Sequence, residues 1–235
     1  MATAGLVIVG NELLTGKTAD ENTPYLTRRL WELGVEVRRV ELVPDELDEI
    51  ARAVRQASQG FELVFTSGGI GPTHDDLTVP GIARALDRDL VAYPELEALI
   101  AAYYRVERLT PVQARMARVP AGSRLVYPPD GRFPQLVVEN VYVLPGIPWL
   151  LRRKFEEVAH LFRREPFQRE RLDLLAEEVE IAPVLNQAVE RWGAVRFGSY
   201  PYLREGEWRV ELTLESRSHA DLSQALEFLR ESLQG

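Results

Sequence analysis

The chain has 235 residues, of which 46% are hydrophobic and 27% charged, and it carries a net charge of −8. This composition is typical of a globular protein with one or two domains. The chain has no cysteine, which excludes disulfides and thiolate metal sites. The negative charge disfavours a general nucleic-acid binder, because phosphate backbones select basic surfaces.

The amino terminus, MATAGLVIVG, lacks the basic start and long apolar core of a signal peptide. No apolar run approaches the roughly 20 residues that a helix needs to span a bilayer. We therefore expect a cytoplasmic protein that makes no contact with membranes.

Apolar strands alternate with amphipathic helices along residues 1–165. The predicted strands cover 5–10, 35–43, 62–65 and 124–127, followed by a hairpin over 136–144 that turns at Glu139-Asn140. The predicted helices start at Asn22 or Thr23, near 47, near Thr78, near 96 and after the LPGIP stretch at 144–148. This alternation predicts an α/β domain of three layers, with a mostly parallel sheet and helices on both faces.

Residues 166–235 have a different character. LDLLAEEVEI, a helix over 184–192, VRFGSY, WRVELTLES and a last helix predict the order β-α-β-β-α. This order indicates a small α+β domain that resembles a KH module. KH modules bind single-stranded RNA, but the GXXG loop that they require is absent. Eight arginines also face thirteen acidic residues over 167–235, so we favour a packing or dimerisation domain without nucleic acid.

The last helix carries an apolar stripe of Leu222, Leu226, Leu229 and Leu233. A domain of this size buries too little surface to be very stable alone. We therefore expect the stripe to pack against the main domain or a second copy, and we predict a homodimer.

The segment TSGGIGPTHDDLT (66–78) follows the third predicted strand. It is no P-loop, because Gly-Lys-Ser/Thr does not follow the glycines, and it lacks the third glycine of a dinucleotide fingerprint. Gly68, Gly69 and Gly71 permit positive φ, so successive N–H groups can converge on an anion. Asp75 and Asp76 would repel a phosphate unless a cation lies between them, which predicts phosphate on the glycines and Mg²⁺ on the aspartates. The alternative is a tight turn with one aspartate capping the next helix.

Two further loops belong to the same predicted edge of the sheet. GNELLTGKTADEN (10–22) follows the first strand, and LPGIP (144–148) precedes a helix. The carboxyl ends of parallel strands share one rim, where ligands bind. We expect Glu12 to join Asp75 and Asp76 there. Asp20 and Asn22 are weaker candidates, and we expect Asn22 to cap the following helix.

These three loops, in this order and spacing, resemble the CinA-type branch of the molybdopterin-binding MoaB/MogA fold family over roughly residues 4–163. The same motifs occur in the amino-terminal domain of eukaryotic FAD synthase, and FGSYP (197–201) with WRVELTLES is similar to the KH-like domain that follows. The resemblance implies hydrolysis of a pyrophosphate bond in ADP-ribose or FAD, with Mg²⁺, Co²⁺ or Mn²⁺ and with K⁺. Relatives in the wider family bind or adenylylate molybdopterin, so the alternative is a non-catalytic carrier of a nucleotide diphosphate or pterin phosphate, linked to molybdenum cofactor metabolism.

On this basis we assign Asp75, Asp76 and Glu12 as catalytic residues and metal ligands, with Glu12 also a candidate base. The predicted ligand-binding residues are Ser67, Gly68, Gly69, Gly71, Thr73, Asn22, Pro145 and Gly146. His74 is more consistent with an ion-paired loop residue than with a catalytic group.

The chain departs from the family in two places. YPPDGRFPQ (127–135) replaces a glycine-rich stretch that bears on substrate choice, and the chain stops after the KH-like unit, so we expect no deamidase activity.

Overall fold

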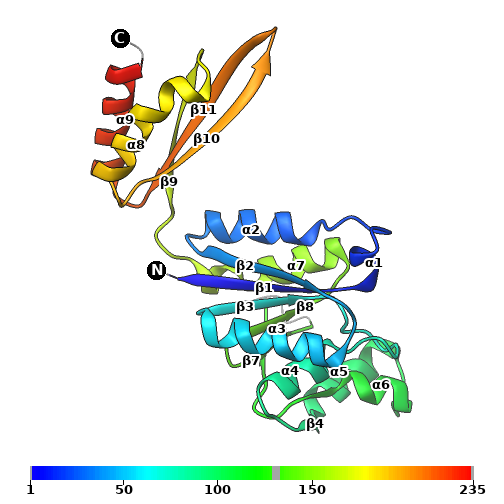
Figure 1. Cartoon of the computed structure of the whole chain (residues 1–235). Helices are drawn as coiled ribbons and strands as arrows, with labels where there is room; N and C mark the ends of the chain where they lie inside the picture. Colours follow the sequence, from blue (N-terminus) through cyan, green and yellow to red (C-terminus); the bar gives the residue numbers. More distant parts are fainter. Residues whose placement is uncertain (1, 129–132, 234–235) are drawn as a thin grey trace. The chain divides into compact units, whose positions relative to one another are not determined.

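The computed structural model describes residues 2–128 and 133–233. It divides into two compact units, Met1–Arg164 and Glu165–Gly235 (Figure 1). Each unit has its own sheet and its own hydrophobic core.

The first unit is built on a six-stranded sheet with the strand order β2-β1-β3-β8-β7-β6. Its strands are β1 (Thr3–Val9), β2 (Glu36–Val43), β3 (Leu63–Ser67), β6 (Arg124–Val126), β7 (Gln135–Val138) and β8 (Val141–Leu144). Strand β1 pairs in parallel with β2 and β3, and β3 pairs in parallel with β8, whereas β7 is antiparallel to both of its neighbours. The prediction of a mostly parallel sheet is confirmed, as is the hairpin at Glu139-Asn140.

Helices cover both faces of this sheet, as Figure 1 shows. They are α2 (Asn22–Glu32) and α7 (Pro148–Val158) on one face, and α3 (Leu47–Gly60) and α4 (Thr78–Ala85) on the other. Successive strand side chains point to opposite faces, so Leu6 and Ile8 join the core under α2 and α7 while Val7 and Val9 join the core under α3 and α4. The three-layer α/β architecture is therefore confirmed.

The region between α4 and β6 contains the helix predicted near 96, which is confirmed as α5 (Pro94–Tyr104), and three short elements that the sequence analysis did not predict. These three are β4 (Leu90–Ala92), α6 (Pro111–Met116) and β5 (Arg118–Pro120). Strands β4 and β5 form an antiparallel ribbon, and Leu96 and Ile100 of α5 form a small core with Ala117 and Val119. Helix α1 (Asn11–Leu14) and the 3-10 turn Ala159–Phe162 complete the unit.

The second unit contains β9 (Gln168–Leu174), α8 (Glu178–Arg191), β10 (Arg196–Arg204), β11 (Glu207–Ser216) and α9 (His219–Leu233). The antiparallel sheet has the order β10-β11-β9, and the predicted β-α-β-β-α order is confirmed. The predicted start of the first helix, at 184, is wrong. A capping box between Glu177 and Glu180 starts α8 six residues earlier, and Pro183 lies inside the helix.

The apolar stripe of α9 packs inside its own unit. Leu222, Leu226 and Leu229 are buried in the core formed with β9, β11 and α8, and Leu233 packs against that core. The expectation that the stripe packs against the main domain or a second copy is therefore wrong, because the sheet of its own unit already covers it. The stripe offers no reason to expect a homodimer.

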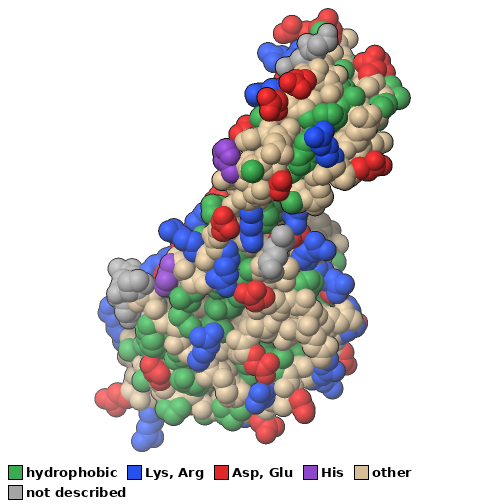
Figure 2. Space-filling model, turned by 90° about the vertical axis from the view of Figure 1, so that its left-hand side faces the viewer, with side chains coloured by type: hydrophobic (Ala, Val, Ile, Leu, Met, Phe, Trp, Pro, Cys, Tyr) green, Lys and Arg blue, Asp and Glu red, His purple; other side chains and the backbone are tan. Residues whose placement is uncertain are grey.

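The surface carries charges of both signs. On the face drawn in Figure 2, acidic and basic side chains are interspersed over both units. No helix among the described residues is long and apolar enough to cross a membrane.

Candidate functional site

The loops that follow β1, β3 and β8 meet at one edge of the sheet. Ser67, the last residue of β3, is paired with Ile8 of β1 and with Leu144 of β8. Beyond the strands, the LPGIP loop and the glycine loop touch, because a Cβ atom built on Gly146 would lie 3.1 Å from the Cα of Gly68. The three predicted loops therefore form one rim at the carboxyl ends of parallel strands, where ligands bind in open α/β sheets.

Asn22 connects these loops. Its side chain is buried, and Nδ2 donates to Ser67 Oγ at 3.0 Å and to the carbonyl of Gly146 at 2.7 Å. The Ser67 hydroxyl in turn donates to the carbonyl of Pro145 at 3.4 Å. The structure thus brings together Asn22, Ser67, Pro145 and Gly146, four of the residues that the sequence analysis named as ligand-binding candidates.

The expectation that Asn22 caps α2 is wrong. Asp20 does this instead, since its Oδ1 accepts from the backbone N–H groups of Asn22 at 2.9 Å and of Thr23 at 3.0 Å. The Asn22 side chain is free to turn inward, and its Oδ1 is buried without a hydrogen-bond partner among the described residues. A buried acceptor without a donor costs about 1–3 kcal/mol. A ligand or water that donates to this oxygen would remove that cost.

The first part of the glycine loop requires glycine on steric grounds. Gly68 and Gly69 have φ values of 99° and 60°. A Cβ on Gly68 would lie 2.2 Å from the carbonyl oxygen of Val9, and one on Gly69 would lie 2.5 Å from Oγ1 of Thr78. Only glycine fits these two positions without moving a neighbouring atom. The loop backbone therefore lies in direct contact with Val9 and Thr78.

Thr78 holds this part of the loop from behind. Its side chain is fully buried, Oγ1 donates to the carbonyl of Gly68 at 2.7 Å, and its amide donates to the carbonyl of Gly69 at 3.0 Å. Sequence reasoning placed Thr78 only at the start of a helix. A threonine at that position was a signal for a polar contact, but its partner lies ten residues back.

The loop amides divide into two groups. In the described part of the chain, the amides of Gly69 and Ile70 make no hydrogen bond, whereas the Gly68 amide donates to the carbonyl of Leu144 at 3.3 Å. The Gly71 and Thr73 amides donate to the carboxylate of Asp76 at 2.7 and 2.6 Å. Among the described residues, the Gly69 and Ile70 amides are therefore available to an external anion beside β3, and the His74 and Leu77 amides are also unpaired farther along the loop.

Asp76 occupies the anion position of the second part of the loop. Besides the two amides, the Thr73 hydroxyl also donates to its Oδ2. Both carboxylate oxygens are thus used inside the loop. The structure places Asp76 next to Gly71 and Thr73, as a brace between them, and it caps no helix.

Asp75 and His74 lie at the exposed surface of the loop. Asp75 Oδ1 lies 3.8 Å from Nδ1 of His74, and both side chains are exposed. Hydrogen bonding from the Thr73 side chain and from the Asp75 amide lowers the pKa of the Asp75 carboxyl, so this group is ionised at neutral pH.

Glu12 lies on α1, and its carboxylate folds back toward its own loop. A Cβ on Gly10 would be 2.7 Å from Oε1 of Glu12. Among the described residues, no group of three His, Cys, Asp or Glu side chains is arranged to hold a metal ion. The structure therefore does not gather Glu12, Asp75 and Asp76 into one preformed ligand set.

A cation that is bound partly by phosphate oxygens of the substrate needs fewer ligands from the protein. Mg²⁺ commonly binds through one or two carboxylates together with substrate phosphates and waters. Asp75 fits that requirement, because its carboxylate is ionised, exposed and close to the free amides of the loop in sequence. Asp76 fits it less well, since three donors already occupy its oxygens.

Arg115 of α6 holds the second part of the loop from outside. Its guanidinium donates to the carbonyl of Pro72 at 2.5 Å and also to the carbonyl of Thr73. The sequence carried no signal for this contact, because Arg115 lies about forty residues later in a region of short elements. Between the glycine loop and α6 opens a cleft of about 360 Å³.

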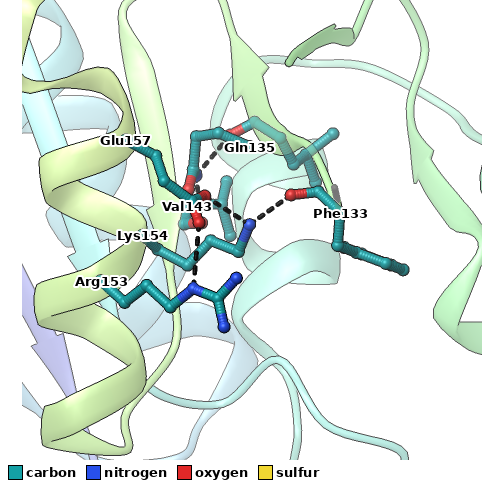
Figure 3. A network of polar contacts seen from close by, with 7 residues as sticks. Phe133, Gln135, Val143, Arg153, Lys154 and Glu157 are labelled. Atoms are coloured by element: carbon teal, nitrogen blue, oxygen red, sulfur yellow. Dashed lines mark hydrogen bonds and ion pairs between the residues drawn. The ribbon is translucent and has the colours of Figure 1, made fainter. Parts of the chain in front are cut away.

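The segment 127–135, which departs from the family pattern, rejoins the sheet beside this rim. Residues 129–132 lie outside the described residues. Lys154 of α7 donates to the carbonyl of Phe133 and is paired with Glu157 at 2.7 Å, while buried Gln135 donates to the carbonyl of Val143. Figure 3 shows this network, with the Phe133 ring pointing away from it. The carboxyl end of the segment is thus fixed to α7 and β8.

Comparison with known proteins gives two family matches. Residues 5–164 match the family described as probable molybdopterin binding domain, and residues 166–235 match the middle domain of FAD synthase. The match with the first family covers more than half of the chain.

Individual relatives agree with these matches. A probable FAD synthase of Caenorhabditis briggsae is 32% identical over 99% of this chain and 50% of its own length. A protein of Archaeoglobus fulgidus is 35% identical over 83% of this chain and 84% of its own length. The crystal structure of the protein CinA, of unknown function, from Thermoplasma acidophilum is 36% identical, with a TM-score of 0.63 over 68% of this chain and 97% of that one. The chain spans about half the length of the FAD synthase relative.

Proposed function

Because this chain belongs to the family of molybdopterin-binding domains and resembles CinA-type proteins, we propose that it hydrolyses the pyrophosphate bond of a nucleotide diphosphate of the ADP-ribose or FAD type, with a divalent metal. Family and fold support a nucleotide-related role, either enzymatic or in binding. The observation that carries the proposal is the pair of free amides at Gly69 and Ile70, at the carboxyl ends of parallel strands.

These amides bind one phosphate of the ligand. Gly68 and Gly69 hold the required backbone, and Thr78 fixes the loop behind them, so the donors are in place before the ligand arrives. Asn22 ties Ser67 to the carbonyl of Gly146 and so fixes the LPGIP loop against the glycine loop. The loop therefore both binds and orients the diphosphate.

Asp75 is the proposed protein ligand of the metal, which would polarise the phosphorus and help ionise a water when bound. Glu12 lies on the neighbouring loop and is the proposed group that accepts a proton from that water. Asp76 supports the site by keeping Gly71 and Thr73 in place.

The alternative function is a non-catalytic carrier of a nucleotide or pterin phosphate. It is favoured by one observation, the lack of a preformed three-ligand metal group among the described residues. A carrier needs the phosphate-binding amides but no oriented water. Binding alone therefore cannot separate the two functions.

The test is a hydrolysis screen of ADP-ribose, FAD and NAD with Mg²⁺, Mn²⁺ or Co²⁺, with and without K⁺. Replacing Glu12 by Gln keeps its size and removes its charge. We expect Glu12→Gln to bind the hydrolysed compound within about tenfold of wild type and to turn it over at least roughly a hundredfold more slowly. Glu21→Gln, in the same 10–22 loop, is the control and should bind and hydrolyse the compound as wild type does. If wild type hydrolyses none of the compounds yet binds a pterin phosphate tightly, the carrier is correct.

A further inference from the structure

The cleft of about 360 Å³ lies on the α6 side of the glycine loop. Residues of the loop, of α4, of the β4-β5 ribbon and of α6 line it. Its apolar walls are Ile70, Leu77, Val79, Pro80, Leu90 and Met116. Asp76, Arg115 and Arg118 add charged groups.

The apolar walls are only half-buried. Ile70, Leu77 and Val79 pack against the core under α3 and α4 on one side and face the cleft on the other. Leu90 lines the cleft without belonging to a hydrophobic core cluster among the described residues. Concave apolar surface with a few polar groups is the usual lining of a small-molecule site.

The two arginines are held at the cleft by backbone carbonyls. Arg115 donates to Pro72 and Thr73, and Arg118 donates to the carbonyl of Leu90 at 2.9 Å. Each guanidinium has further N–H groups beyond those used in these bonds. Guanidinium groups pair well with aromatic ring systems and with phosphates.

The cleft and the phosphate-binding amides share residues. Gly69 and Ile70, whose amides make no hydrogen bond in the described part of the chain, also line the cleft. A phosphate on these amides therefore lies at the mouth of the apolar space. At about 360 Å³ the cleft is near the lower end of the 300–1,000 Å³ that ligand pockets typically span. It has room for one base with its sugar and not for both halves of a dinucleotide.

We propose that this cleft binds the adenine base of the ligand, with its adjoining phosphate on Gly69 and Ile70. The choice of adenine rests on the proposed function, because the adenosine diphosphate moiety is what ADP-ribose and FAD have in common. The other half of the ligand then extends away from the cleft, toward Asn22 and the LPGIP loop.

The test compares three ligands by isothermal titration calorimetry. AMP carries base, sugar and phosphate; ribose 5-phosphate lacks the base; and pyrophosphate lacks base and sugar. We expect wild type to bind AMP roughly tenfold more tightly than ribose 5-phosphate, the scale of one buried aromatic ring. Leu90→Trp fills the cleft and should abolish this preference while leaving affinity for ribose 5-phosphate and pyrophosphate unchanged.

Val91→Trp is the matched control, because Val91 is the next residue of the same strand, is exposed and does not line the cleft. It should keep the preference for AMP. Met116→Trp fills the cleft from α6 and gives a second test if Leu90→Trp fails to fold. Equal binding of AMP and ribose 5-phosphate by wild type, or a preserved preference in both filled variants, would overturn the inference.

Binding of adenosine, which has no phosphate, separates this inference from the proposed function. If pyrophosphate and ribose 5-phosphate fail to bind while adenosine binds to wild type and not to Leu90→Trp, the cleft is correct and the phosphate site is wrong. If pyrophosphate binds and adenosine and AMP show no contribution from the base, the phosphate site stands and the cleft assignment fails.

Discussion

The two parts of the glycine loop differ in what their backbone amides bind. Gly68, Gly69 and Ile70 leave two amides without a partner among the described residues, and Thr78 holds them from behind. In the second part of the loop, Asp76 instead accepts from the Gly71 and Thr73 amides. A glycine-rich stretch is thus not one continuous anion cradle. An acidic side chain inside the loop can itself accept hydrogen bonds from some of the loop amides.

The closed part also gives the open part its shape. Asp76 fixes the amides of the second part, and Arg115 fixes its carbonyls. With both kinds of backbone group held, Gly69 and Ile70 have less freedom to lose when a phosphate binds. Variants that break one part of the loop at a time should therefore differ in their effects.

Gly68→Ala should have the largest effect. Its Cβ would lie 2.2 Å from the Val9 carbonyl oxygen, and the residue has a φ of 99°, so backbone of β1 would have to move. We expect a loss of at least about 3 kcal/mol in the free energy of unfolding, measured by chemical denaturation. Gly122→Ala is the control, because it has a φ of +83° but no atom within 4 Å of the added Cβ. Its cost should be about 1–2 kcal/mol, and an equal loss in both variants would show that the Val9 contact is unimportant.

Asp76→Asn should have the next largest effect. The amide keeps one acceptor oxygen in place of two, so at least one of the donors at Gly71 and Thr73 loses its partner. We expect the free energy of unfolding to fall by about 1–3 kcal/mol and phosphate affinity to weaken. Asp75→Asn should melt as wild type, because Asp75 is exposed. If the two variants show the same stability, Asp76 does not brace the loop.

Arg115→Met tests the outer contact and should change stability little, by less than about 0.5 kcal/mol, because the side chain lies at the surface. The carbonyl of Pro72 then loses its donor, and the carbonyl of Thr73 keeps only the Asp76 amide at 3.3 Å. Amide hydrogen exchange over 71–76 should become faster, while exchange in β3 stays unchanged. Arg108→Met, at another exposed position, is the control. Unchanged exchange at Gly71 and Thr73 would mean that Asp76 alone holds the loop.

Thr73→Val should have the smallest effect, visible in the titration of Asp75. Hydrogen bonding from Thr73 lowers the pKa of Asp75 below its ordinary value of 3.8. Because the folded-state pKa is the lower one, the stabilising contribution is present above pH 3.8 and is lost as the pH falls through the folded value. Carbon-13 NMR should show the Asp75 pKa rising toward 3.8 in Thr73→Val and staying low in Thr73→Ser. No rise in the valine variant would assign the shift to the backbone.

The sequence by itself determined the main strands and helices of the first unit and the three loops of the rim, but not the short elements α1, β4, α6 and β5. Strand alternation and helix periodicity are local patterns, so they predict elements without knowledge of distant contacts. The parallel topology then places the ends of β1, β3 and β8 at one edge, where Ser67 of β3 lies beside the LPGIP loop.

Only the tertiary structure decided which partner each polar or apolar side chain contacts. Asn22 was expected to cap α2, yet Asp20 takes that place and Asn22 faces Ser67. Asp76 binds amides of its own loop, and Arg115 reaches that loop from α6. The leucine stripe of α9 is covered by the sheet of its own unit. In each case several partners satisfy the same chemistry, and a difference of a few ångströms between backbone positions selects one of them, because hydrogen bonds and apolar contacts fade over that distance.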